Sequence, residues 1–597
     1  MTSEVKVDTL SGSTGAGTSV TITGGTITGI TDLAVADGGT GASTAATARS
    51  NLSAAMSGAN TDITSLSSRA VSALIISVLD YGAIGDGVTD DTTAIQSALT
   101  AGAGEIVWFP AGTYKISATL EASDGTKMLG VGACNILDPL DAGSNISVTH
   151  TATPAVNLLL GAGIDGLNFW YPNQVTTNPP TVYDYTIEVD TTASNAGVTL
   201  QNIVIHNAYN GINLGGNPAA DTPVYGTVAM DNIRMCALNT AFRSGRTLSE
   251  VFLSNSFVSP VVWTASIGTA VREWMTASGG AAFHFEAGQG WQMSNVVVFG
   301  KKWGIYGQSS DANVARGNLT FLSCSNVILD SCRICIEVTG NMALGASTFS
   351  GCTFTAGDSY NSGFSGGKCL YLNDSQGANS ATFTGCEFLG TEGSHVVMEA
   401  ATSTAVNFMQ FDGCQFYNAN NNNQAGTFYN IYCDDTRMRL SLTDLTIENL
   451  IASSSIVRVK IVNAAQLMLD GIHVLDSTNQ IFNVATIATA LSVRGILARS
   501  TTASAWPTSG APTIASATAL TLYDLDSPLY LISGTTNITS MTASWPGRAV
   551  TLKFADVLTF TDGNNLILAG NLVTSANDTI SLVCDGTNWY ETARSVN

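Results

Sequence analysis

The chain has 597 residues, of which 45% are hydrophobic and 11% are charged, against roughly 25% charged residues in a typical globular protein. This low charge, together with 59 glycines, favours a turn-rich β-structure that buries a continuous core and presents Ser, Thr and Asn outside. The formal net charge of −22 excludes a general electrostatic attraction to nucleic acid or to anionic membranes.

An acidic ligand would need a local exception to this negative charge. Lys301 with Lys302 and Arg243 with Arg246 are the candidates, and scattered solvated charge is the alternative. The first residues contain no apolar run of signal-peptide length, and residues 71–79 are too short to span a bilayer. We therefore expect synthesis in a host cytoplasm and no membrane insertion.

The 11 cysteines show neither zinc-ligand spacing nor the density of a disulfide scaffold, so we expect no metal and no cofactor. Cys332 and Cys335 form a CxxC pair. On one continuous strand, residues three positions apart point to opposite faces, which argues against a redox or metal role for the pair.

Residues 1–70 are rich in Gly, Ser, Thr and Ala, and by themselves indicate short strands or a flexible linker. Within them, VADGGTGASTAATARSNL at residues 35–52 resembles a short motif found near the start of many phage tail fibres and tailspikes. The resemblance implies attachment to the virion here, through phage tail or baseplate proteins.

Residues 71–117 are predicted to form a linker followed by a capping strand-helix-strand unit. We expect a short strand at 78–81, a helix that begins at Thr89 or Asp90, and strands at 106–109 and 113–116. The predicted helix places four apolar residues on one face, which needs a surface to cover: Ala94, Ile95, Ala98 and Leu99.

The segments DYGAIGDGVTDDTTAIQSAL and VWFPAGTY in this unit resemble the N-terminal signature of the pectate-lyase-like superfamily, which includes many phage tailspikes and tail fibres. The resemblance implies a right-handed parallel β-helix whose first rung is capped by the helix. It also implies that Asp86, Asp90 and Asp91 serve the cap and its turns rather than catalysis.

Residues 118–503 are predicted to be the β-helix body, because short strands alternate with turns at irregular spacing. Two repeated patterns are expected to stack along it, one as hydrogen-bonded turns and one as small buried side chains. The members are Asn202, Asn232, Asn255 and Asn295 in the first pattern, and Cys352, Cys386 and Cys414 in the second.

An aromatic, proline-rich segment interrupts the body at residues 168–189. Trp170 and Tyr171 in this segment offer flat apolar faces that suit sugar stacking. Packing against the helix wall or a neighbouring subunit is the alternative.

Residues 504–512 are predicted to be a linker and residues 513–597 a C-terminal antiparallel β domain. This last region resembles small C-terminal domains of phage tail proteins. Trp589 and Tyr590 would serve either trimerisation or glycan binding there.

Catalysis on a β-helix would use two carboxylates brought together from different rungs. The candidates in the rungs are Glu286, Asp330, Glu337, Glu387, Glu392, Glu399, Asp412, Asp434 and Asp435. Glu387 and Asp412 are favoured because they lie beside the aligned Gly-Cys positions, and Asp434 with Asp435 because they are adjacent.

A lyase would instead need a base such as His284 or His395. The sequence leaves open whether this protein is an enzyme.

The resemblances together imply a homotrimeric tail fibre or tailspike of the virion that recognises a host surface polysaccharide. A depolymerase that cleaves this polysaccharide, by hydrolysis or elimination, is the alternative.

Overall fold

The chain divides into two units, Met1–Leu74 and Ile75–Asn597. The computed structural model describes Thr47 and residues 75–597, except 133–142, 190–196, 216–225, 246–249, 264–267, 310–318, 341, 359–363, 365, 374–377, 400–405, 420–426, 449–455, 476–481, 495–496, 499–512, 523–527 and 545. The predicted attachment region 1–70, Thr47 apart, and the predicted linker 504–512 therefore lie outside the described residues.

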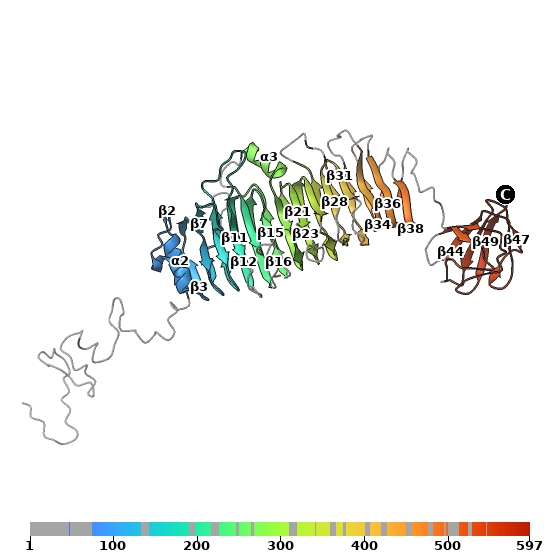
Figure 1. The fold of residues 1–597 in the computed structure, drawn as a ribbon, viewed down its shortest axis with the longest axis horizontal. Coiled ribbons are helices and arrows are strands. Elements are labelled where there is room, and N and C mark those ends of the chain that lie inside the picture. Colours follow the sequence, from blue (N-terminus) through green and yellow to red (C-terminus); the bar gives the residue numbers. More distant parts are fainter. Residues whose placement is uncertain are drawn as a thin grey trace, which may run out of the picture. The chain divides into compact units, whose positions relative to one another are not determined.

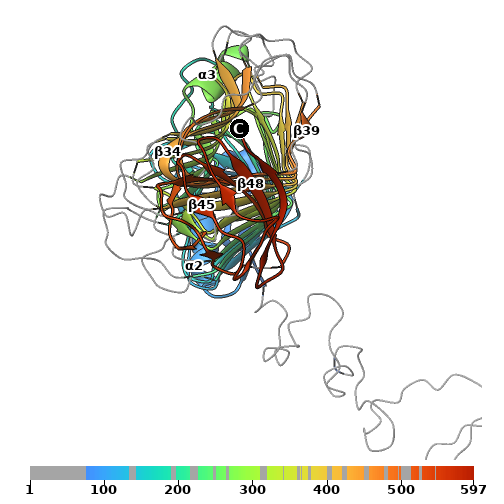
Figure 2. The ribbon, with the colours of Figure 1, turned by 90° about the vertical axis from the view of Figure 1, so that its right-hand side faces the viewer.

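Most of the described strands belong to one 36-stranded sheet in which every pairing is parallel. The chain winds so that each turn adds a strand to each of three series, and each strand pairs with the corresponding strand of the next turn (Figure 1). Figure 2 looks along the stack, where strands of successive turns lie behind one another. This is the architecture of a right-handed parallel β-helix, so the predicted fold class is confirmed.

The first series consists of β1 (Ile75–Ser77), β3 (Ile106–Phe109), β6 (Lys127–Gly130), β9 (Gly163–Asp165), β12 (Val198–Ala208), β14 (Val228–Ala237), β16 (Val251–Ser254), β20 (Trp291–Phe299), β23 (Ser323–Cys332), β26 (Ser347–Ser350), β29 (Ser380–Thr384), β32 (Asn407–Asp412) and the later parts of β34 (Phe428–Thr443), β36 (Ile456–Asp470) and β38 (Phe482–Val493).

The second series consists of β2 (Asp86–Asp90), β4 (Gly112–Ile116), β7 (Ser144–Val148), β10 (Leu167–Trp170), the later parts of β12, β14, β20 and β23, and then β17 (Phe257–Val258), β27 (Thr353–Ala356), β30 (Glu387–Leu389), β33 (Gln415–Tyr417), β35 (Thr446–Glu448), β37 (His473–Val474) and β39 (Leu497–Ala498).

The third series consists of β5 (Leu120–Ala122), β8 (Val156–Leu158), β11 (Tyr185–Val189), β13 (Asn210–Leu214), β15 (Phe242–Ser244), β18 (Ala281–Phe285), β21 (Trp303–Ser309), β24 (Ile334–Gly340), β28 (Lys368–Asn373), β31 (Ser394–Glu399) and the first parts of β34, β36 and β38.

Part of the interior is built from identical side chains stacked at strand spacing. The rings of Phe349 and Phe383 lie 4.5 Å apart and almost parallel, and Phe411 continues the stack at 5.0 Å from Phe383. Cys352 and Cys386, with the equivalent Cys414, are fully buried at the neighbouring corner. The prediction of stacked buried cysteines is confirmed, and their burial leaves them a packing role.

A hydrogen-bonded asparagine ladder follows the corner between the first and second series. Asn232 Nδ2 donates to Asn202 Oδ1 at 2.9 Å, Asn295 Nδ2 to Asn255 Oδ1 at 3.3 Å, and Asn326 Nδ2 to Asn295 Oδ1 at 2.8 Å. All five of these residues have φ between 51° and 54°. Asn is one of the few residues that tolerates this left-handed conformation. The predicted ladder is therefore confirmed, but in two runs, because Asn255 Nδ2 donates to Asp231 Oδ1 at 2.8 Å.

Helix α2 (Thr92–Ala101) covers the first turn of the solenoid, as predicted (Figure 1). Ile95, Ala98 and Leu99 are fully buried, and the Gln96 side chain exchanges two hydrogen bonds with the backbone of Glu121. The aspartates serve local structure: Asp91 Oδ1 accepts from Ile84 N at 2.7 Å, and Asp90 Oδ1 accepts from Thr92 N at 3.0 Å.

Two local predictions in this unit were wrong. Residues 78–81 form a 3₁₀ helix rather than a strand, because Ser77 Oγ accepts from Leu79 N and Gly82, at φ 94°, closes the turn onto the Leu79 carbonyl. The α-helix begins at Thr92 rather than at residue 89 or 90, because residues 86–90 pair with β4 as strand β2.

The side chains of Cys332 and Cys335 do not point to opposite faces of one strand, which corrects the expectation for this CxxC pair. β23 ends at Cys332 and β24 begins at Ile334, so the chain turns a corner between the two cysteines, with Ser331 at φ 53°. Both thiols are fully buried in the interior, and burial raises their pKa.

Helix α3 (Thr269–Ala277) lies outside the strand walls (Figure 1). Its Val271 and Met275 pack with Leu238 and Trp263 in a small separate core. Thr276 Oγ1 donates to Asp358 Oδ2 at 3.0 Å, which ties the helix to the corner after β27. No helix in the described part of the chain has the length and apolar composition of a bilayer-spanning segment.

A separate C-terminal β domain with its own core is present, as predicted, but its main sheet is mixed rather than purely antiparallel. β40 pairs with β42 and β42 with β44 in parallel, whereas β48 pairs with β44 and β49 antiparallel. The strands are β40 (Thr513–Ala515), β41 (Ala519–Leu520), β42 (Leu529–Ser533), β43 (Ser540–Met541), β44 (Ala549–Phe554), β45 (Thr559–Phe560), β46 (Leu566–Ile567), β47 (Leu572–Val573), β48 (Thr579–Cys584) and β49 (Trp589–Ser595).

We expect Leu99→Asp to prevent folding, because it places an unpaired carboxylate where the cap meets the core, at a cost of about 4 kcal/mol or more. Thermal unfolding and solubility of the purified protein measure this. Ser97→Asp, on the exposed side of the same helix, is the matched control and should melt like the unaltered protein. A soluble Leu99→Asp protein with unchanged melting would contradict the capping role.

Candidate functional site

One continuous row of register partners on the third series concentrates polar, aromatic and titratable side chains. On each strand, the residues before and after the one in this row, such as Ile305, Ile336 and Leu370, are buried inside. Because successive side chains of a strand point to opposite faces, the row itself faces outward. We call it the polar row; its members are Glu121, Asn157, Glu188, Asn213, Arg243, His284, Tyr306, Glu337, Tyr371, Val397, Tyr432, Lys460 and Asn483.

An aromatic platform lies in the middle of the polar row. The Trp303 and Tyr306 rings stack at 4.2 Å and 15° between ring planes, and the His284 ring lies 5.4 Å from Tyr306. Lys302 Nζ lies 3.9 Å from the centroid of the Trp303 ring. Burial lowers the pKa of His284 and of Lys302. The platform is thus a layered arrangement in which Lys302 Nζ lies over the Trp303 ring and the Trp303 ring stacks on Tyr306.

Glu337 is positioned next to this platform on the following turn. Its side chain accepts a hydrogen bond from Trp303 Nε1 at 2.6 Å on one oxygen and a long one from Asn373 Nδ2, at 3.5 Å, on the other. Only 8% of the residue is exposed. Both partners come from neighbouring turns, so the stacking itself holds the orientation of this carboxylate.

Glu399 lies two turns further along and is exposed. Tyr371 Oη donates to Glu399 Oε2 at 2.8 Å, and Lys368 Nζ lies 4.1 Å from the centroid of the Tyr371 ring. Burial, followed by the neighbouring Glu399, raises the pKa of Tyr371. Asp434 is the register partner of Glu399 on the next turn. Three carboxylates therefore lie along one outer wall.

The arrangement suits a glycan chain that runs along the wall. We call Trp303, Tyr306, Glu337, Lys368, Tyr371 and Glu399 the aromatic–acid cluster. Stacked rings bind the apolar faces of sugars, and carboxylates and a lysine bind their hydroxyl groups. Backbones of adjacent strands lie about 4.8 Å apart, so the register partners Glu399 and Asp434 are close to the short end of the carboxylate spacing that glycoside hydrolysis uses.

The favoured sequence-predicted carboxylates are not brought together. Glu387 and Asp412 do lie on adjacent turns, but the register pairs Glu387 with Gln415 and Asp412 with Thr384. A corner separates the two, because Glu387 begins β30 of the second series and Asp412 ends β32 of the first.

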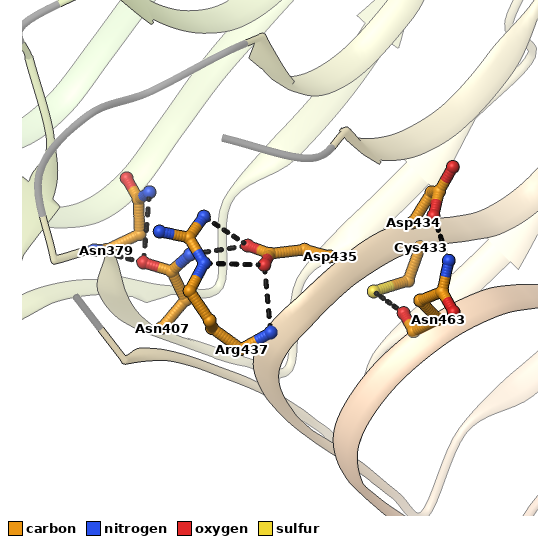
Figure 3. Close-up of polar contacts among 7 residues, drawn as sticks. All are labelled: Asn379, Asn407, Cys433, Asp434, Asp435, Arg437 and Asn463. Atoms are coloured by element: carbon orange, nitrogen blue, oxygen red, sulfur yellow. Dashed lines mark hydrogen bonds and ion pairs between the residues drawn. The ribbon is translucent and has the colours of Figure 1, made fainter. Parts of the chain in front are cut away.

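The adjacent pair Asp434 and Asp435 is also split (Figure 3). Asp435 is 2% exposed, binds Arg437 Nε at 3.1 Å and accepts from Asn407 Nδ2, whereas Asp434 points the other way and accepts from Asn463 Nδ2 at 2.7 Å. Both residues lie in β34, and successive side chains of a strand point to opposite faces. Only Asp434 reaches the wall that carries the cluster.

Two of the four aromatic residues predicted to bind glycan are buried packing residues. Tyr171 is 1% exposed, with its hydroxyl bonded to Thr186 Oγ1 and its ring against Tyr183, and Trp589 is fully buried in the C-terminal core. Neither can present a face to a sugar. Trp170 is half-buried, and Tyr590 is 38% exposed with its hydroxyl donated to Asp585 Oδ2 at 2.9 Å.

The basic residues named from the sequence divide between interior and wall. Lys301 is buried, with Nζ bonded to the carbonyls of Ala237 and Leu238, and burial lowers its pKa to about 7. Lys302 belongs to the aromatic platform, and Arg243 of the polar row is paired with Glu286 at 2.8 Å. Arg246 lies outside the described residues. Lys302 and Arg243 thus supply local positive charge on the wall of an otherwise acidic chain.

Sequence reasoning named Glu337 and Glu399 only within a long set and missed Trp303, Tyr306 and Tyr371. A signal for the row exists: the tripeptides FHF, IYG, IEV, LYL, VVM and IYC each place one outward residue after an apolar one. It becomes informative only once the strands are aligned by register. Among the described residues, no group of three or more His, Cys, Asp or Glu is arranged to hold a metal ion.

The comparisons with known proteins agree with the fold. A family model described as rhamnogalacturonase A/epimerase, pectate lyase-like, matches residues 75–153. Mannuronan C5-epimerase AlgE5 of Azotobacter vinelandii is 53% identical over 51 residues, which are 8% of this chain and 5% of the epimerase. The chain therefore forms a parallel β-helix whose first turns, within residues 75–153, resemble the pectate-lyase-like proteins.

Two solved structures are similar at low sequence identity. Pre-mature gene product 12 of bacteriophage phi29 is 13% identical with a TM-score of 0.48, and the alignment covers 78% of this chain and 63% of that one. Tailspike protein 3 of bacteriophage CBA120 is 13% identical with a TM-score of 0.34, covering 70% and 59%.

His395, considered from the sequence as a base, is fully buried beside Asn430, so it cannot reach an external glycan. Burial, with a further contribution from Arg458, lowers its pKa from 6.5 to about 3. Since the unfolded chain takes up this proton at higher pH than the folded chain, the stability contribution is complete above about pH 6.5 and is lost as the pH falls toward 3.

We therefore expect that lowering the pH from 7 to 4.5 lowers the melting temperature of the unaltered protein by more than that of His395→Gln. The difference in free energy of unfolding should be on the order of 2 kcal/mol, measured by calorimetry at both pH values. Equal falls in the two proteins would show that His395 does not titrate in this way.

Proposed function

We propose that this chain is a phage tail fibre or tailspike that recognises a host surface polysaccharide across the aromatic–acid cluster. The observation that carries the binding part is the stack of Trp303 on Tyr306 beside the Glu337 and Glu399 carboxylates on one outer wall. Rings and carboxylates held by neighbouring turns need little ordering when a ligand binds, which favours affinity.

The viral part of the proposal is supported by the sequence resemblances at residues 35–52 and 78–117. On this proposal, the protein is a homotrimer located in the virion tail. Residues 1–70 attach it to tail or baseplate proteins, and it acts at the exterior of the host cell.

We expect Trp303→Ala to weaken polysaccharide binding about tenfold, because it removes an aromatic contact worth on the order of 1.4 kcal/mol. The unaltered protein is first screened against an array of purified bacterial capsular and O-antigen polysaccharides, and the affinity for a bound one is then measured by calorimetry. Tyr590→Ala, an exposed aromatic residue of the C-terminal domain, is the control and should bind normally. Loss in Tyr590→Ala but not in Trp303→Ala would move the site to the C-terminal domain.

A second candidate function, cleavage of the bound polysaccharide, is favoured by the spacing of the carboxylates. One carboxyl group would protonate the leaving oxygen and the other would activate water or attack the sugar. Glu399 and Asp434, which are register partners on adjacent turns, are the residues in these roles.

For this candidate, we expect polysaccharide chains incubated with the unaltered protein to shorten, and Glu399→Gln and Asp434→Asn to slow shortening by a factor of about 100 to 10,000. Size-exclusion chromatography of the products measures the chain length. Glu387→Gln, on the second series, is the matched control and should cleave normally. Bound but unshortened chains would exclude cleavage and leave recognition alone.

A further inference from the structure

A hollow separate from the aromatic–acid cluster lies beside strands of the first series. Here a small parallel sheet of β19 (Gly288–Gln289), β22 (Leu319–Thr320) and β25 (Leu344–Gly345) precedes β20, β23 and β26 along the chain. The hollow has a volume of about 580 Å³, within the range of roughly 300–1,000 Å³ typical of small-molecule sites. Its lining residues come from successive turns, and none belongs to the polar row.

Phe321 is the unusual residue of this hollow. It is 55% exposed, and its φ of 58° lies in the left-handed region that a bulky side chain seldom adopts. Its backbone is held there, since Phe321 N donates to Gly345 O at 2.9 Å. A strained backbone costs about 1–3 kcal/mol and is found mostly at functional sites.

The neighbouring turns show what this position normally requires. β19 and β22 pair Gln289 with Thr320, and β22 and β25 pair Thr320 with Gly345, so the next residues Gly290, Phe321 and Ala346 correspond. All three have positive φ, and two of them are the small residues Gly and Ala. Gly adopts this conformation without strain. At Phe321 the chain instead exposes a large ring at the mouth of a hollow. The left-handed backbone disfavours such a side chain, and the ring does not pack in the core.

The walls around Phe321 are polar but nearly uncharged. Gln292, Ser323 and Thr348 are register partners on successive turns and are exposed. Gln289 adds an amide, and Glu250 is the one titratable side chain among the residues that line the hollow. Amides and hydroxyls provide both donors and acceptors, without the cations that a phosphate or a uronate would require.

We propose that the Phe321 hollow is a second binding site, which takes a neutral hexose or N-acetylhexosamine unit of a glycan. The Phe321 ring stacks on the apolar face of the sugar, and the amides of Gln289 and Gln292 with the hydroxyls of Ser323 and Thr348 bind its hydroxyl groups. This site goes beyond the proposed function, because it is a different surface with a different ligand chemistry.

Saturation-transfer NMR on the full-length protein with maltotetraose, cellotetraose and chitotetraose tests this proposal. We expect transfer to at least one of the three, and a loss of affinity of tenfold or more in Phe321→Gly. Because glycine relieves the left-handed strain, this variant should melt no lower than the unaltered protein, which separates lost binding from lost folding. Phe408→Ala is the matched control, since Phe408 is 38% exposed on β32 of the same series but does not line the hollow.

Three results would overturn the proposal. One is the absence of transfer to all three oligosaccharides. Another is unchanged affinity of Phe321→Gly for the oligosaccharide. If the sedimentation mass of this variant also changes, Phe321 is a contact between copies of the chain. The last is loss of saturation transfer in Trp303→Ala, which would place the sugar on the aromatic–acid cluster. Saturation transfer that is retained in Trp303→Ala supports a second site, whether or not the cluster binds polysaccharide.

Discussion

The in-register parallel hydrogen bonding between successive turns is the constraint on which the rest of this molecule depends. Since each strand bonds to the corresponding strand of the next turn, a residue's neighbours are set by register rather than by distance along the chain. Phe349, Phe383 and Phe411 form one stack for this reason, and Asn202 and Asn232 form part of a hydrogen-bonded ladder. The cap completes the scheme, because α2 covers the apolar surface of the first turn that the structure describes.

The same constraint builds the outer wall. Alternate side chains of each strand are used by the core, which leaves the others to line up outside, and on the third series these are aromatic and titratable. Trp303, Glu337 and Tyr371 come from three different turns, yet each is oriented by a contact to another turn. A rigid wall of this kind suits an extended ligand, because little side-chain freedom remains to be lost when the ligand binds. Different rows on the same scaffold can therefore bind different sugars.

Burial separates the titratable groups of this protein into two kinds. Lys301, His395 and Asp435 are enclosed, and their partners are backbone carbonyls or neighbouring side chains, so they hold corners of the solenoid together. Glu399 and Asp434 face outward along the wall. The distinction matters for function because an enclosed charge is committed to structure, whereas an outward carboxylate supported by a tyrosine or an asparagine remains available to a ligand.

The sequence alone predicted the asparagine ladder and the buried cysteines from repeated short motifs. It predicted the β-helix and its capping helix through the resemblance of residues 78–117 to a known signature. It was not sufficient for the site. Asp434 and Asp435 are adjacent in sequence but point to opposite faces of β34, while Glu399 and Asp434, 35 positions apart by number, are register partners. Tyr171 and Trp589 looked like sugar-binding residues and are buried. Loop lengths vary from turn to turn, so spacing does not reveal register, and only the tertiary structure decided which side chains meet on the outer wall.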